Sequence, residues 1–196
     1  MVSGSLDVIN RALSFLGESP IQSIDEDSAP ATTARQQYDQ ARRAALREYN
    51  WSFALRRAHL ARLAEGVPGV YRFTYQLPAD CLRPVRVVDP ADRVPPDRSP
   101  VVGYEPVGNR RIACDSEDPV LEYVADIDDP TLFDDGFADC FAYRLASEMC
   151  TSITGDANRA LSYLQMARQI AREAAAQSGR ERRDPATVNP YVEARR

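Results

Sequence analysis

The stretch ALREYNWSFALRRAHL, residues 45–60, joins two kinds of hydrophobic pattern. Before the tryptophan, apolar residues recur at steps of three and four, which is typical of a helix that buries one face. From the tryptophan onward, Trp51, Phe53 and Leu55 alternate with smaller or charged residues, which is typical of a strand. We therefore predict that a helix delivers the chain into a sheet, and that these aromatic residues are the first inward-facing residues of that sheet. The predicted core of this junction is formed by Tyr49, Trp51 and Phe53.

Helical periodicity flanks this stretch on both sides. Apolar spacing predicts helices over residues 5–17 and 30–49, a third that ends at Gly155, and a fourth from Asp156 to Gly179. Between them, short alternating segments separated by turns predict four to six antiparallel strands. We therefore expect an α+β fold, mainly α, in which a four-helix bundle carries an inserted antiparallel β-rich lobe and an extended C-terminal tail.

The same pattern predicts three parts of the chain. Residues 1–50 and 128–179 form the helical bundle, residues 51–127 form the β-rich insertion lobe, and residues 180–196 form an extended arm. The arm contains two prolines and several arginines, and no core periodicity runs through it. We expect this arm to lie outside the packed body.

Two local features of the sequence refine the expected lobe. Gly108-Asn109 is a hairpin turn signal. Pro84 interrupts an otherwise apolar strand, which predicts an edge position because proline cannot donate to a ladder.

Composition narrows the function classes. The chain has 196 residues and a net charge of −5, which argues against a protein that coats nucleic acid. All of its basic residues are arginines, whose planar donors suit fixed ion pairs. Its 4 cysteines lack C-x-x-C spacing, so we expect reduced thiols made in a cytosol. No apolar run reaches the length of a membrane span, so we expect no membrane partner.

Catalytic and metal-binding patterns are missing from the sequence. The single histidine, His59, has no metal-ligand or triad spacing around it, so we expect no enzyme, no cofactor and no metal site. The acidic cluster from Asp126 to Asp135 lacks the glycine and the glutamate of a calcium loop, since Thr131 and Phe137 stand at those positions. We interpret these acids as stabilising a helix start. An alternative is a negative channel lining, and the possible lumen acids are Asp128, Asp129, Asp134 and Asp135.

Two arginine pairs flank the tryptophan. They could form a nucleic-acid patch, but acids are interleaved with arginines throughout this region. That mixture favours ion pairs between subunits over a phosphate track. The residues predicted to form these subunit ion pairs are Arg42, Arg43, Arg56 and Arg57.

Three blocks of the sequence occur in a characteristic order. The first is residues 38–60, with Tyr-Asp, Arg-x-x-x-Leu, the tryptophan and Phe-Ala. The second is YQLPADCLRPVRV, residues 75–87, and the third is residues 119–156, with Phe133-Asp134 and Thr-Gly-Asp at its end. Together these blocks resemble the head-to-tail adaptor family of short-tailed bacteriophages, often called tail tubular protein A. The likeness spans about residues 3–178, and the loop over residues 89–110 matches least.

This resemblance implies a structural virion protein, found at the head-tail connector and assembled in the cytoplasm of a bacterial host. It implies a ring, expected to be a dodecamer, that lies below the portal protein, lets DNA pass and docks the tail nozzle or next tail component. We further predict that residues 180–196 reach the portal. The predicted portal-binding residues are Arg182, Arg183, Pro190, Tyr191, Arg195 and Arg196.

Two alternative functions remain open. One is an adaptor or head-completion protein of a long-tailed phage or phage-like particle, with a similar ring role. The other, which we favour less, is a small enzyme or a DNA-binding regulator.

Overall fold

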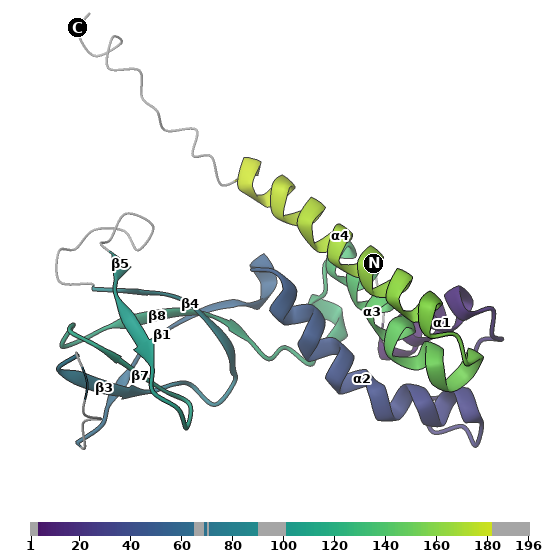
Figure 1. The fold of residues 1–196 in the computed structure, drawn as a ribbon, viewed down its shortest axis with the longest axis horizontal. Coiled ribbons are helices and arrows are strands. Elements are labelled where there is room, and N and C mark those ends of the chain that lie inside the picture. The colour runs from purple at the N-terminus through teal and green to yellow at the C-terminus, as the bar shows by residue number, and fades with distance from the viewer. Residues whose placement is uncertain (1–3, 65–68, 70, 90–100, 182–196) are drawn as a thin grey trace, which may run out of the picture.

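The computed structural model describes residues 4–64, 69, 71–89 and 101–181. The helices come from both ends of the chain and lie together on one side of the molecule, and the two antiparallel sheets from the middle of the chain lie on the other (Figure 1). The helices are α1 (Ser5–Leu16), α2 (Ala29–Glu48), α3 (Asp135–Thr154) and α4 (Ala157–Glu181). Short 3-10 turns occupy Ser52–Ala54 and Pro130–Leu132. The α+β class is therefore confirmed.

Local signals in the sequence set the helix ends. Gly17 follows α1 with φ 83°, and Gly155 follows α3 with φ 72°; at both positions a left-handed backbone favours glycine. The Ser28 side chain accepts a hydrogen bond from the Ala31 amide and caps α2, which carries a proline in its first turn.

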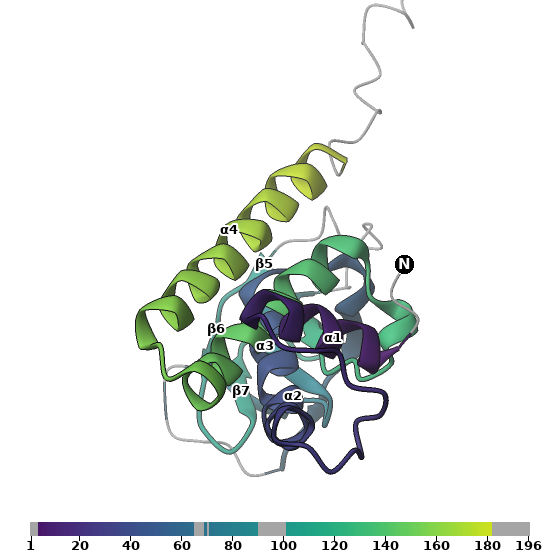
Figure 2. The same ribbon diagram turned by 90° about the vertical axis from the view of Figure 1, so that its right-hand side faces the viewer.

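The helices are arranged around α3. This helix packs against α1, α2 and α4, whereas those three make few contacts with one another. Figure 2 shows α4 running past the other helices toward the C-terminus. A four-helix bundle is not confirmed, because the arrangement is a central helix with three neighbours. Helix α4 ends two residues beyond the predicted Gly179, so the first two residues of the expected extended arm are helical, and residues 182–196 lie outside the described part.

The strands form two four-stranded antiparallel sheets. The first has the order β1-β8-β4-β5 and the second the order β2-β3-β7-β6. Their bounds are β1 (Leu55–His59), β2 (Ala61–Arg62), β3 (Phe73–Gln76), β4 (Cys81–Val88), β5 (Val101–Val102), β6 (Tyr104–Pro106), β7 (Arg111–Cys114) and β8 (Val120–Ala125). The described residues thus contain more strands than the four to six predicted, because two-residue pairings leave no periodic signal.

The sheets test two predictions for the lobe, the hairpin turn at Gly108-Asn109 and the edge position of Pro84. β6 and β7 pair across the predicted turn, where Asn109 and Arg110 have positive φ, so the hairpin is confirmed. β4 lies between β8 and β5, but β5 pairs only with Val87 and Val88. At Pro84 the described partner is β8 alone, and the register shifts between Pro84 and Arg86. The edge prediction therefore holds for the first half of β4 only.

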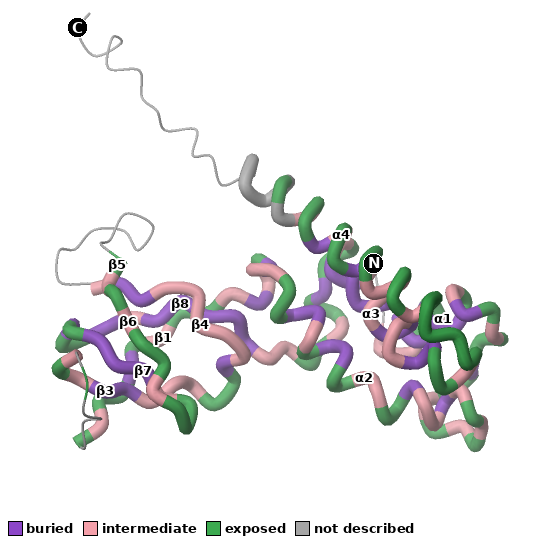
Figure 3. Tube along the Cα trace, in the orientation of Figure 1, coloured by how far each residue is buried: buried purple, intermediate pink, exposed green. Residues whose placement is uncertain are grey.

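Two hydrophobic clusters stabilise the molecule (Figure 3). The larger one lies among the helices and contains the edge-to-face aromatic pairs Trp51–Phe137 and Phe133–Phe137. The smaller one lies between the sheets around Tyr75 and Leu121.

The predicted strand at Trp51 is wrong in one respect. Residues Ser52–Ala54 form a 3-10 turn, and β1 begins only at Leu55. Trp51 and Phe53 therefore pack in the helical cluster and are not the first inward residues of the sheet. The Trp51 indole N–H donates to the Ala45 carbonyl at 3.0 Å, which holds the ring against the end of α2. Alternate spacing alone cannot separate such a turn from a strand.

Candidate functional site: the junction between α2 and the first sheet

The last turns of α2 are tied to the end of β8 by a shared carboxylate. Arg42 donates to Asp126 Oδ1 at 2.5 Å and to the Ile127 carbonyl, and Arg43 Nε donates to Asp126 Oδ2 at 2.8 Å. The Arg42 side chain is only 3% exposed, whereas that of Arg43 is 50% exposed. Charged hydrogen bonds of this kind hold two elements in one orientation.

A second contact joins the segment after α2 to β4. The Arg83 guanidinium donates to the Asn50 side-chain oxygen. Tyr49 packs edge-to-face on Trp51, so the predicted junction residues meet at the end of α2. Helix, linker and sheet therefore contact one another through both polar and aromatic side chains.

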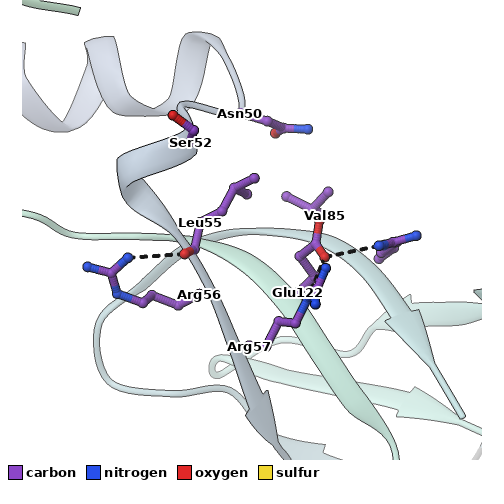
Figure 4. Close-up of a pocket in the computed structure, with 8 residues that line it drawn as sticks. Asn50, Ser52, Leu55, Arg56, Arg57, Val85 and Glu122 are labelled. Atoms are coloured by element: carbon purple, nitrogen blue, oxygen red, sulfur yellow. Dashed lines mark hydrogen bonds and ion pairs between the residues drawn. The ribbon is translucent and has the colours of Figure 1, made fainter. Parts of the chain in front are cut away.

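A pocket of about 870 Å³ opens beside this junction (Figure 4). Figure 4 shows Asn50 and Ser52 on one side of it and Val85 and Glu122, from the sheet, on the other. The lining residues are Asn50, Ser52, Leu55, Arg56, Arg57, Val85, Arg86 and Glu122. Arginines and apolar side chains therefore share one concave surface, whose volume is in the range of small-molecule and side-chain pockets.

Two of the lining arginines share the Glu122 carboxylate. Arg57 Nε and the Arg86 guanidinium reach the same oxygen, Oε2, at 2.9 and 3.1 Å. Burial by itself raises the pKa of Glu122, but the hydrogen bonds from both arginines favour the charged form more strongly, so the pKa lies below its ordinary value. Glu122 therefore stays ionised and holds both guanidinium groups at the pocket wall.

Arg56 differs from its neighbour. Its guanidinium donates to the carbonyls of Phe53 and Leu55, at 2.8 and 3.1 Å, and within the described residues it forms no ion pair. Three lining arginines thus face one lining carboxylate, and the pocket has an excess of two positive charges.

The acidic cluster has several separate roles. Asp134 caps α3 by accepting from the Phe137 amide at 2.7 Å, and Asp129 accepts from the Thr131 amide at the short turn before it. The interpretation that acids stabilise a helix start is confirmed for Asp134. Asp128, Asp129, Asp134 and Asp135 are exposed, and their lumen role stays a prediction.

The turn after β3 is held by residues that sequence reasoning did not select. Arg110 donates to three carbonyl oxygens of this turn, those of Pro78, Ala79 and Cys81. The Tyr123 hydroxyl donates to the Asp80 carboxylate at 3.1 Å. Glu122 and Arg86 were missed as well. An acid inside the apolar strand VLEYVA was the one available signal for Glu122, since a charge there needs a partner.

The remaining reactive groups are engaged or buried. His59 Nδ1 lies 3.0 Å from a carboxylate oxygen of Asp118 on an exposed surface. The four cysteines are free and buried, and burial raises the pKa of Cys140 to about 12. Among the described helices, none has the length and apolar character of a membrane span.

The family model for the tail tubular protein matches residues 6–94. The resemblance noted in the sequence is therefore confirmed over this range, which runs from α1 through the junction and past the end of β4. The tail tubular match indicates a structural protein of a bacteriophage tail, and hence a component of the virion. A structural family of this kind argues against an enzyme. The curated proteins contain no match to the chain.

The tail tubular match covers only some of the predicted site residues. All four arginines predicted to form subunit ion pairs lie inside residues 6–94, as does the junction core. Within the chain, Arg42 and Arg43 both bind Asp126, and Arg57 binds Glu122, whereas Arg56 is the member of this set without an acidic partner among the described residues. The six residues of the predicted portal-binding arm lie both outside the match and outside the described residues: Arg182, Arg183, Pro190, Tyr191, Arg195 and Arg196.

Proposed function

We propose that the chain is a head-to-tail adaptor, a ring subunit that binds below the portal, lets DNA pass and docks the next tail component. The observation that supports this most is the tail tubular family match over residues 6–94. We further propose that the ring has twelve copies and assembles in the host cytoplasm.

The junction is consistent with such a role. An adaptor has to hold one docking surface at a constant angle to another while DNA is under pressure above it. Arg42 and Arg43 bind Asp126 from α2, and Trp51 is buried against the same helix. Side chains with several simultaneous contacts resist bending because no single rotamer change releases them. We propose that residues 1–50 and 128–179 form one docking part and residues 51–127 the other.

The exposed arginines are the candidates for ion pairs between subunits of the proposed ring. Arg42 is buried and paired with Asp126 inside the chain. Contacts between subunits are therefore expected from the exposed arginines of the two pairs. Arg56 and Arg57 both lie at the open pocket and are the best candidates.

The C-terminal arm is proposed to bind the portal. Truncation after Gly179 is expected to abolish addition to the portal while leaving the unfolding midpoint unchanged, because the described residues of the two hydrophobic clusters end at position 174. An extended arm that orders on binding contributes affinity through its own contacts. Undiminished portal binding by the truncated chain would remove the arm from the proposal.

Native mass spectrometry of the full chain with its cognate portal ring tests the function directly. We expect saturable addition of one copy per portal subunit. A folded chain that adds to no intact portal ring would overturn the adaptor assignment. In that case a tail component other than the adaptor is the remaining role within the tail tubular family.

A further inference from the structure

The arginine pocket has the features of a binding site for a protein segment. Its wall contains the apolar side chains of Leu55 and Val85 beside three guanidinium groups. Within the described part of the chain, Arg57 and Arg86 bind a single Glu122 oxygen and Arg56 has no carboxylate partner, so the three guanidinium groups keep donors that the described residues do not use. The complementary ligand is therefore an apolar side chain surrounded by carboxylates.

The same chain exposes such a segment. The loop over residues 128–135 holds Leu132, which is 48% exposed, among the carboxylates of Asp128, Asp129, Asp134 and Asp135. Among the residues that the structure describes, no arginine forms an ion pair with Asp128, Asp129 or Asp134. Leu132 is thus an apolar side chain that faces solvent within an acidic loop.

We propose that loop 128–135 of one copy binds the arginine pocket of a neighbouring copy, with Leu132 against Leu55 and Val85 and the loop acids against Arg56 and Arg57. The contact joins two different surfaces of the chain, so it is heterologous, and a heterologous contact generates a ring where its rotation closes. It rests on the proposed ring function and identifies the partner of this pocket as a second copy. It also replaces the lumen role predicted for the loop acids.

Site-directed cross-linking tests the contact without removing a charge. Ser52→Cys introduces a thiol at the pocket, Thr131→Cys introduces one beside Leu132, and the four native cysteines are buried. The two full-length variants are mixed with the cognate portal, and separately at high concentration without it, and treated with a short bismaleimide. We expect a cross-linked dimer in the mixture and monomers from either variant alone and from the wild-type chain.

A charge exchange tests the chemistry of the contact. Arg56→Asp and Asp128→Arg are each expected to weaken association between copies by about tenfold, and the double variant is expected to regain most of that loss. The matched controls are Arg72→Asp and Asp27→Arg, which change exposed residues away from the pocket and the loop. Equal losses in the controls would contradict the proposal.

The outcomes separate this inference from the adaptor assignment. A portal that takes one copy per subunit, with no cross-link between positions 52 and 131, overturns the loop contact and leaves the adaptor role. A cross-link between copies without portal addition supports the contact and removes the adaptor role. If Arg56→Asp abolishes binding of a short DNA duplex and no cross-link forms, the pocket binds phosphate and the inference is wrong.

Discussion

The two arginine pairs on either side of Trp51 have the same composition and different surroundings. Arg42 and Arg43, on α2, converge on the single carboxylate of Asp126, and Arg42 is nearly excluded from solvent. Arg56 and Arg57, at the start of β1, lie at an open pocket, where only Arg57 has an acidic partner among the described residues. The first pair stabilises the fold and the second leaves charge available to a partner.

Position on the secondary structure accounts for this difference. Consecutive residues on a helix point about 100° apart, so both side chains of the first pair can reach one strand end from the same turn. Consecutive residues on a strand point to opposite faces, so Arg56 and Arg57 cannot share a partner in the same way. Arg57 meets Glu122 across the ladder, and Arg56 turns back to local carbonyls.

The largest effect is expected from the residue between the pairs. Trp51→Ala should lower the free energy of unfolding by about 3–5 kcal/mol, because it removes a large buried ring and its hydrogen bond to Ala45. Urea denaturation of the full chain measures this. Trp51→Phe, which keeps much of the ring, should cost clearly less, and a loss below about 1 kcal/mol for the alanine variant would refute the core role.

The second-largest loss of stability is expected at Arg42, and Arg43 provides the comparison. Arg42→Ala should destabilise the fold by about 2 kcal/mol, less than for a fully buried ion pair because Asp126 keeps Arg43 and some solvent. Arg43→Ala is the control and should cost about 0.5 kcal/mol, since half of its side chain is in water. Equal losses in thermal or urea unfolding would show that burial does not separate the two.

A smaller, pH-dependent loss of stability is expected at Glu122, the partner of Arg57 in the second pair. The folded-state pKa of Glu122 is lowered, so its stabilisation is present above the ordinary carboxyl pKa, about 4.3, and is lost as pH falls from there through the lowered value. Glu122→Gln should cost about 1 kcal/mol at pH 7 and much less near pH 3. Unfolding midpoints at the two pH values provide the measurement, and a constant difference would contradict the ionised state.

The smallest effect on stability is expected at Arg56. Arg56→Ala should change the free energy of unfolding by less than about 0.5 kcal/mol, because the side chain is exposed and bound only to local carbonyls. Association between copies should nevertheless weaken. A large loss of stability in urea denaturation would place Arg56 with the first pair and end the contrast.

Much of the fold could be predicted because its signals are local. The helix ends at Gly17 and Gly155 and the hairpin at Gly108-Asn109 depend on backbone angles that few residues adopt. The start of β1 could not be predicted, because the residues of the 3-10 turn after Trp51 show the same alternation of apolar and polar residues as a strand. Two-residue strands such as β2 and β5 depend on partners distant in the chain.

The candidate site was predicted only in its residue types. Sequence reasoning selected the four arginines but assigned all of them to contacts between subunits. It missed Glu122 and Arg86, which come from different strands and meet only through the pairing of β4 with β8. The pocket is lined by residues from several elements, so the residue spacing within one segment does not reveal it.

By itself, the sequence determined the α+β class, the order of the helices and of the longer strands, the helix caps and the resemblance to tail tubular proteins, because each depends on neighbours along the chain. Only the tertiary structure decided which arginines are occupied and which are available. Asp126 lies more than eighty residues from Arg42 and Glu122 more than sixty from Arg57, and electrostatic pairing acts through space.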